Sequence, residues 1–399
     1  MMASTTSGAP PATYLTPRLL RPSKVQITTL QTPISKRTEE FNGDENEYVL
    51  HCVHTVDGST MATALSNYQI KIYDRYTLEP KASSALEGHL GPLTGLCPSP
   101  DHPSLLVSSS EDKTVRLWDL RVQSGCVSVI QQVDEALSCA FGKGSGLLAV
   151  GVGCHVDFFD ARQTKQESKG ASGGAQGGSR ASGERLGRYA DVHTDIVTKV
   201  VFHPSQTTTL ASASEDGLVC LYDTGVSQAD EALACILNAE SPVRDITFFG
   251  AKGDGLALLT GSEGTSVWHW PSALRALDVE DLRQSAGSFD REKALFSIQY
   301  HYDQGTDRLR LALSDVEGSV TVVEVQPGGE MHPILRLESG HKSLVRAVDS
   351  HDGTWVTGGE DARLCLWNEK EQEGQVNQST AFDRKQKKGK KLAPHFQPY

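Results

Sequence analysis

A pattern repeated in three segments constrains this 399-residue chain more than any other feature of its sequence. In each segment an aspartate (Asp112, Asp216 or Asp361) stands six positions before an aromatic residue, and a histidine stands 29, 29 or 26 positions before it. The histidines and closing aromatic residues are His89 with Trp118, His193 with Tyr222, and His341 with Trp367. Because residue type and spacing agree together, the pattern indicates an internal repeat of the kind found in stacked architectures.

Weaker copies of the pattern fill the gaps between these segments. The closing positions fall near residues 73, 118, 159, 222, 268, 323 and 367, and four of the six intervals are 41 to 46 residues long; the others are 63 and 55. Short β-prone runs such as 106–108 and 210–212 are bounded by Gly, Ser and Asp, so each copy is expected to consist of strands. One such unit cannot bury both of its faces, which favours stacking in a closed ring.

The Gly-His…Trp-Asp signature, clearest from Gly88-His89 to Trp118-Asp119, resembles that of the WD-repeat family. The resemblance implies an all-β fold, a seven-bladed β-propeller spanning 24–368 in which each copy is one four-stranded blade. A strand expected at 25–30 precedes the first full copy, and the last copy stops at Trp367. We therefore expect this N-terminal strand to close the last blade as its outer strand.

The regions outside the repeats have their own composition. Residues 1–23 and 369–399 are expected to be disordered tails, and the Gly/Ser-rich stretch 163–184 a flexible surface loop. The acidic stretch 271–292 has room for a short helix between the fifth and sixth blades. At roughly 150 residues per domain the length alone suggests two or three domains. The repeat instead indicates one domain, a single propeller.

The net charge of −12 is spread unevenly along the chain. Residues 1–24 and 369–399 each carry +3, which leaves −18 for residues 25–368. An acidic body lacks the clustered Lys and Arg that bind phosphates, so nucleic acid is not expected as a partner except through the basic tail. A basic protein is the more plausible partner of such a body. No run approaches the ~18 apolar residues of a membrane span, so no membrane partner is expected.

The basic tail contains six Lys or Arg residues within 384–391. Such a run is a candidate for nuclear import or nucleic-acid contact, and its alternative interpretation is a solvated tail. We expect a nuclear and/or cytoplasmic protein, with the tail favouring the nucleus. The eight cysteines form no CxxC pair, which is typical of buried thiols in a reducing compartment.

Three residue types of a hydrolase triad recur in the repeats: His89 with Ser108 and Asp112, His193 with Ser212 and Asp216, and His341 with Thr357 and Asp361. A catalytic site need occur only once, so three copies at one spacing indicate architecture rather than an enzyme. The family resemblance implies structural tetrads in which the closing residue (Trp118, Tyr222 or Trp367) donates to the hydroxyl, the hydroxyl bonds to His, and His bonds to Asp. No cofactor or metal is expected; His51 and His54 would point to opposite faces of a strand.

One motif suggests a specific partner. Trp118-Asp119-Leu120-Arg121 resembles the Trp-Asp-x-Arg motif by which WD-repeat substrate receptors dock on the adaptor of cullin–RING ubiquitin ligases, and Asp160 and Arg162 echo it one copy later. An exposed guanidinium can form a forked pair with an acidic partner. The alternative is that Arg after Trp-Asp is common in this repeat.

Four further residues are candidate partner contacts. In the family, positions just after the first buried residue of the inner strands face the narrow end of the ring, and here they hold Thr94, Thr198, Arg244 and Arg346. Arg is enriched at interfaces. The sequence thus predicts a non-catalytic scaffold that binds other proteins and forms no homo-oligomer; its alternative is a substrate receptor of a cullin–RING ligase.

Overall fold

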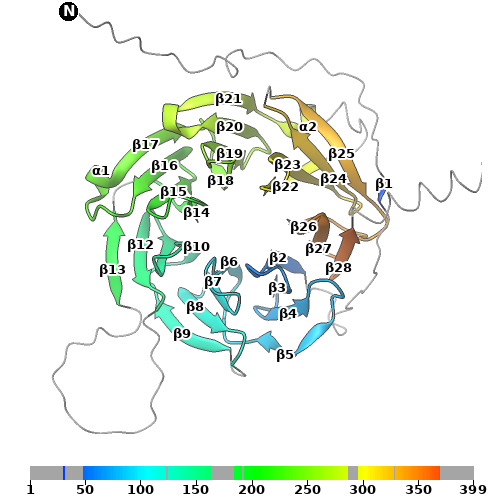
Figure 1. Ribbon diagram of the computed structural model, residues 1–399, viewed down its shortest axis with the longest axis horizontal. Coiled ribbons are helices and arrows are strands. Elements are labelled where there is room, and N and C mark those ends of the chain that lie inside the picture. The colour runs from blue at the N-terminus through cyan, green and yellow to red at the C-terminus, as the bar shows by residue number, and fades with distance from the viewer. Residues whose placement is uncertain are drawn as a thin grey trace, which may run out of the picture.

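In the computed structural model the described residues form seven sheets around a central axis, and all but one of their strand pairs are antiparallel (Figure 1). The structure describes residues 30–31, 48–122, 125–162, 184–190, 193–285, 295–327 and 329–368. The expected tails 1–23 and 369–399, residues 163–183 of the expected loop, and residues 25–29 of the expected N-terminal strand lie outside these ranges.

The first four sheets, called blades one to four, contain four strands each. Blade one has β2 (Val49–His54), β3 (Thr60–Leu65), β4 (Ile70–Asp74) and β5 (Pro80–Leu86). Blade two has β6 (Leu93–Pro98), β7 (Leu105–Ser110), β8 (Thr114–Asp119) and β9 (Cys126–Gln131). Blade three has β10 (Ala136–Phe141), β11 (Leu147–Val152), β12 (His155–Asp160) and β13 (Arg185–Tyr189). Blade four has β14 (Val197–Phe202), β15 (Thr209–Ser214), β16 (Leu218–Asp223) and β17 (Leu233–Asn238).

The remaining blades complete the ring. Blade five has β18 (Val243–Phe249), β19 (Gly255–Thr260), β20 (Thr265–His269) and β21 (Leu274–Val279). Blade six has β22 (Leu295–Asp303), β23 (Arg308–Asp315), β24 (Val320–Val325) and β25 (Met331–Leu337). Blade seven has β26 (Val345–His351), β27 (Thr354–Gly359) and β28 (Leu364–Asn368). Each of the seven closing positions found in the sequence lies on a third strand or at its end, which confirms the seven-bladed all-β fold.

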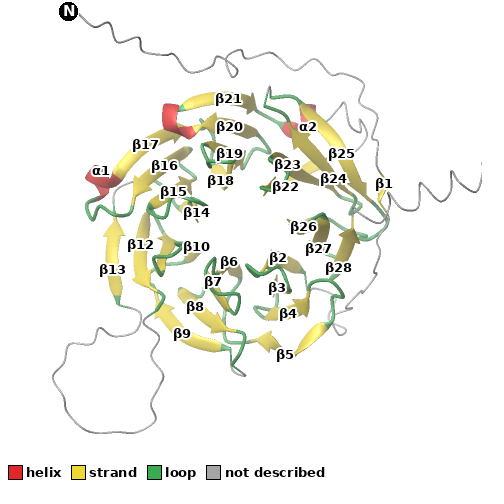
Figure 2. Cartoon of the chain, viewed as in Figure 1, coloured by secondary structure: helices red, strands yellow, loops and turns green. Residues whose placement is uncertain are grey.

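Strands within a blade pair in chain order, with the first strand innermost (Figure 2). Short helical turns occur in the connections: α1 (Ala229–Ala232), η1 (Trp270–Ser272) and α2 (Leu282–Ser285). The last of these confirms the short helix expected between blades five and six. None of the helices in the described segments is long and apolar enough to cross a membrane.

The hydrophobic core of the described residues consists of seven clusters, one at each seam between neighbouring blades. The closing aromatic residue of a blade fills the seam with the preceding blade. Trp118 of blade two packs with Ile72 and Leu86 of blade one, and Trp367 of blade seven packs with Val322 of blade six. Large aromatic residues bury much area, which explains why this position so often holds one.

The N-terminal strand differs from the expectation. The strand β1 (Leu30–Gln31) pairs in parallel with β25, the outer strand of blade six, at Leu30↔Arg336 and Gln31↔Leu337. The prediction that it closes blade seven is therefore wrong for the described residues. It was based on counting strands, and every blade has an outer edge with free backbone groups on which an extended segment can pair.

Side chains close the seam between blades seven and one. Val49 and Leu65 of blade one pack with Val356 of blade seven. His54 Nδ1 lies 2.6 Å from Asp349 Oδ2, and the Arg75 guanidinium donates to the carbonyls of Gly58 and His351. The ring thus closes through packing and polar contacts between its first and last blades.

Candidate interaction surfaces

The ring has two ends that differ in the loops they carry. We call the end with the second-to-third-strand turns and the connections between blades the tetrad end, because the aspartates and histidines of the tetrads lie there. The other end carries the remaining turns, including those at Arg121 and Arg162, and we call it the arm end. Successive antiparallel strands run in opposite directions, so the turns that join them lie alternately at the tetrad end and at the arm end.

Blade two brings its four tetrad residues into one hydrogen-bonded chain. The Trp118 indole donates to Ser108 Oγ over 2.8 Å, and Ser108 Oγ lies 2.7 Å from His89 Nε2. His89 Nδ1 lies 2.8 Å from Asp112 Oδ2. The Trp118 and Ser108 side chains are fully buried. These hydrogen bonds give each buried polar group of the tetrad the partner that burial requires.

Blades seven and four have the same arrangement with one difference. In blade seven Trp367 donates to Thr357 Oγ1 over 2.9 Å, and His341 bridges Thr357 and Asp361 at 2.7 and 3.0 Å. In blade four His193 bridges Ser212 and Asp216 at 2.7 and 3.1 Å. The buried Tyr222 hydroxyl lies near Ser212 and Cys220 but makes no hydrogen bond of normal length and angle. The structure therefore joins three of the four predicted members in blade four.

The tetrads are poorly suited to nucleophilic catalysis. Burial lowers the pKa of His89, because it disfavours the protonated imidazolium that a catalytic histidine would have to form. Burial alone would raise the pKa of Asp112, but hydrogen bonds from Thr114, the Leu90 backbone and His89 outweigh it and lower that pKa to about 2. Ser108 Oγ is enclosed and already bound to two partners, so no substrate can approach it.

The tetrads also position the loop residue that follows each histidine. The backbone N–H groups of Leu90, Thr194 and Lys342 donate to the tetrad aspartates over 2.9, 3.0 and 2.8 Å. This bond fixes the backbone while the side chain faces solvent, and Leu90 is 85% exposed. Val133, in the next connection of the tetrad end, is 74% exposed. A fixed backbone thus presents side chains that differ from blade to blade.

The four predicted inner-strand contacts divide into two kinds. The hydroxyls of Thr94 and Thr198 donate to the carbonyls of Ala136 and Val243 in the following blade, over 2.5 and 2.6 Å. They are half-buried and link blades. Arg244 and Arg346 are exposed at the tetrad end; Arg244 donates to Ser297 of blade six.

Arg346 differs from Arg244 in its partner. Its Nε donates to Glu360 Oε1 over 2.6 Å, so the pair lies within blade seven. Thr94 and Thr198 therefore offer little to a partner, whereas both arginines keep exposed surface at this end.

The Trp-Asp-x-Arg segments form forked arms at the arm end. Arg121 donates through Nε and Nη2 to Asp119 over 2.9 and 2.7 Å, and its side chain is 74% exposed. Arg162 pairs with Asp160 in the same way and is 71% exposed. Trp118 is buried and cannot contact a partner directly. The exposed part of each motif is thus its arginine.

Sequence reasoning missed a group of ionisable side chains on the inner strands. Lys199 Nζ lies 3.0 Å from Asp245 Oδ1 of the next blade. Burial and the charge of Lys199 lower the pKa of His51 to about 4, and burial lowers the pKa of His301 to about 4. The sequence contains a signal for this ion pair. Lys199 and Asp245 have opposite charges, and each stands two positions after the first residue of its inner strand, in the neighbouring blades four and five. The described residues contain no cluster of His, Cys, Asp or Glu that could hold a metal ion.

Comparisons with known proteins agree with this geometry. The family described as WD domain, G-beta repeat matches residues 80–119, 184–223 and 332–368. Each match starts at the fourth strand of one blade and ends at the third strand of the next, so the repeat is offset from the blade.

Several curated proteins are similar to this chain. WD repeat-containing protein 89 homolog of Dictyostelium discoideum is 29% identical over 82% of this chain and 84% of its own length. WD repeat-containing protein GTS1 of Arabidopsis thaliana is 28% identical over 84% of each chain. WD repeat and SOCS box-containing protein 1 of Mus musculus is 39% identical, but over only 23% of this chain and 22% of its own length.

Proposed function

Because the chain belongs to the WD-repeat family of seven-bladed β-propellers, we propose that it is a non-catalytic platform that binds other proteins. The observation that carries the proposal is the arrangement at the tetrad end. Buried tetrads fix the backbone of the connecting loops, while exposed side chains such as Leu90 vary between blades. Exposed apolar side chains on a rigid frame favour partner binding over chemistry.

Affinity purification with mass spectrometry tests this function. The double variant Leu90→Glu/Val133→Glu should keep the wild-type melting temperature, because both side chains are exposed, and should lose partners that bind at the tetrad end. Val129→Glu is a matched control, since Val129 is 47% exposed on the outer strand β9. Partners recovered equally with all three proteins would place binding elsewhere, and recovery of no specific partner would contradict the proposal.

A second candidate function is that of a substrate receptor of a cullin–RING ubiquitin ligase. The exposed Arg121 and Arg162 arms favour it, because each keeps a guanidinium edge free for an acidic partner. The similarity to the SOCS box-containing protein covers too little of the chain to add support.

The ligase function predicts that Arg121→Ala/Arg162→Ala abolishes co-purification of the adaptor. Arg283→Ala is the matched control, because Arg283 makes the same forked pair with Asp281 but lies at the tetrad end. Adaptor recovery that survives the double substitution would remove this function and leave the platform unaffected.

The basic run 384–391, outside the described residues, supports nuclear import as a separate proposal. A fluorescent fusion that lacks residues 369–399 should move from the nucleus to the cytoplasm, and an unchanged distribution would contradict import through this tail.

A further inference from the structure

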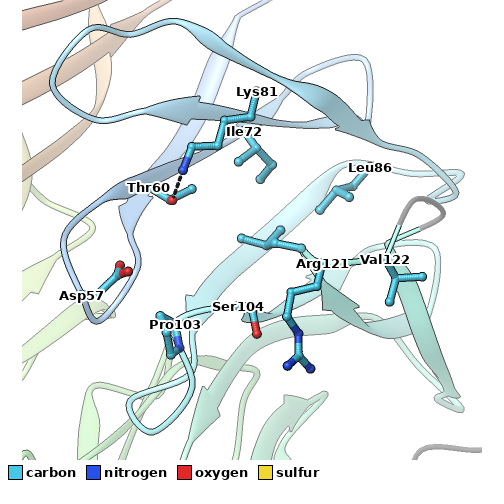
Figure 3. Close-up of a pocket in the computed structure, with 10 residues that line it drawn as sticks. Asp57, Thr60, Ile72, Lys81, Leu86, Pro103, Ser104, Arg121 and Val122 are labelled. Atoms are coloured by element: carbon cyan, nitrogen blue, oxygen red, sulfur yellow. Dashed lines mark hydrogen bonds between the residues drawn. The ribbon is translucent and has the colours of Figure 1, made fainter.

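The seam between blades one and two contains a cavity of about 220 Å³ towards the arm end (Figure 3). Ile72 and Leu86 of blade one are buried in its wall, and Leu120 of blade two faces them. Val122, 44% exposed, lies at its edge. The cavity therefore has one aliphatic wall, and polar side chains such as Thr60 and Ser104 complete its lining.

The size of the cavity limits its occupant. Pockets that enclose small molecules or cofactors measure about 300–1,000 Å³. A smaller surface cavity with an aliphatic wall suits one apolar side chain, the usual anchor of a short peptide at an interface, and its polar lining suits a polar neighbour of that side chain. The first determinant of the ligand is thus a single aliphatic side chain.

Two cations at the cavity supply the second determinant. The Lys81 ammonium donates to Thr60 Oγ1 over 2.5 Å and has no carboxylate within ion-pair distance in the described part of the chain. Arg121 uses Nε and Nη2 for Asp119, which leaves Nη1 for another acceptor. Both side chains are exposed, so a ligand can reach them.

The one acidic residue of the lining, Asp57, makes its hydrogen bonds within its own turn and, among the described residues, forms no ion pair with either cation. Asp57 Oδ1 accepts from Thr55 Oγ1 over 2.6 Å, and Asp57 Oδ2 accepts from Ser59 Oγ over 2.9 Å. Its carboxylate is thus occupied within its own turn. The N–H groups of Lys81 and the Nη1 group of Arg121 remain available at the cavity, and such cationic donors favour a carboxylate.

We propose that this cavity, lined by Lys81, Arg121, Ile72, Leu86, Leu120 and Val122, binds a peptide segment of a partner protein in which an aliphatic residue is flanked by Asp or Glu. The aliphatic side chain fills the cavity, and the carboxylate pairs with Lys81 and the free edge of Arg121. The proposal rests on the platform function and assigns it a second binding surface, on the end opposite Leu90.

A random peptide library displayed on phage, selected on the immobilised full-length chain, tests this site. The enriched peptides should share an aliphatic residue next to Asp or Glu. In fluorescence polarisation, Lys81→Ala should weaken the best peptide roughly tenfold, the loss expected for one charge-assisted contact. Val122→Asp should weaken it by a similar factor, because it places a negative charge beside the peptide carboxylate. Both positions are exposed, so the melting temperature should not change. Arg162→Ala, on the equivalent arm of the next blade, should bind like wild type.

Three results would overturn the site: no enrichment, a consensus without an acidic residue, or equal affinity for wild type, Lys81→Ala and Val122→Asp. These results leave the platform function standing if Leu90→Glu/Val133→Glu still removes partners. If peptides depend on Lys81 while the tetrad-end variant loses nothing, the cavity binds and the tetrad end does not.

Discussion

At the scale of single residues, the tetrads differ in how many buried polar groups depend on one hydroxyl. Ser108 Oγ serves both the Trp118 indole and His89, whereas Ser212 Oγ serves His193 and leaves the Tyr222 hydroxyl without a hydrogen bond. The membership of each tetrad could be predicted from the sequence, because residue type and spacing recur. The missing link at Tyr222 could not, because a phenol hydroxyl and an indole N–H project from different points of their rings.

This difference predicts unequal costs for the same substitution. Ser108→Ala leaves two buried groups without a partner, and Ser212→Ala leaves one, at about 1–3 kcal/mol for each. In urea unfolding, Ser108→Ala should therefore lower the free energy of unfolding more than Ser212→Ala. Thr357→Val, which removes a hydroxyl with two partners in blade seven, should resemble Ser108→Ala. Equal losses at Ser108 and Ser212 would contradict this account.

Residue type also failed to predict the direction of some side chains. Thr94 and Thr198 occupy the positions where partner contact was expected, yet their hydroxyls bond to carbonyls of the next blade. Spacing along one strand places a residue near an end of the ring. Whether its hydroxyl turns towards solvent or a neighbouring blade depends on a strand some 40 residues away, which the local pattern does not encode.

At the scale of elements, the third strands were predictable and the partner of the N-terminal strand was not. The third strand carries the closing residue, usually aromatic, that packs in the seam between two blades. Each copy of the repeat therefore indicates in the sequence where its third strand lies. Leu30–Gln31 pairs through the backbone with β25, and backbone pairing leaves little trace in the sequence. The cavity between blades one and two could not be predicted for a related reason, since its lining comes from six separate turns and strands.

Deletion of residues 1–32 distinguishes the two possible partners of the N-terminal strand. Hydrogen exchange should become faster in the outer strand of blade six, residues 331–337, because that edge loses its pairing with Leu30–Gln31. Exchange in residues 364–368 of blade seven is the internal control and should stay unchanged. Faster exchange in 364–368 instead would restore the original expectation that this segment closes blade seven.

At the scale of the whole molecule, ring closure concentrates ionisable groups that the individual blades keep apart. His51 and His301 lie on inner strands of blades one and six, and Lys199 and Asp245 on those between. A single copy of the repeat contains at most a few of these residues. The four residues come from four different inner strands around one axis, so their proximity depends on the closed ring (Figure 1).

The closed ring should therefore lose stability on mild acidification. Histidines of the unfolded chain take up protons near pH 6.5, about their ordinary pKa, whereas burial lowers the pKa of His51 and of His301 to about 4 in the folded ring. Between these values the unfolded chain binds more protons, so stability falls as the pH drops through the window and this contribution levels off below it.

Urea unfolding midpoints measured from about pH 7.5 to about pH 4.5 should decline across this window. His301→Gln removes one such group, so its unfolding free energy should depend less steeply on pH, by up to about 1.4 kcal/mol per pH unit. His102→Gln is the matched control, because His102 is exposed, and it should keep the wild-type slope. A midpoint that stays constant over the range, or equal slopes for wild type and His301→Gln, would show that His301 accepts a proton in the folded ring as readily as in the unfolded chain.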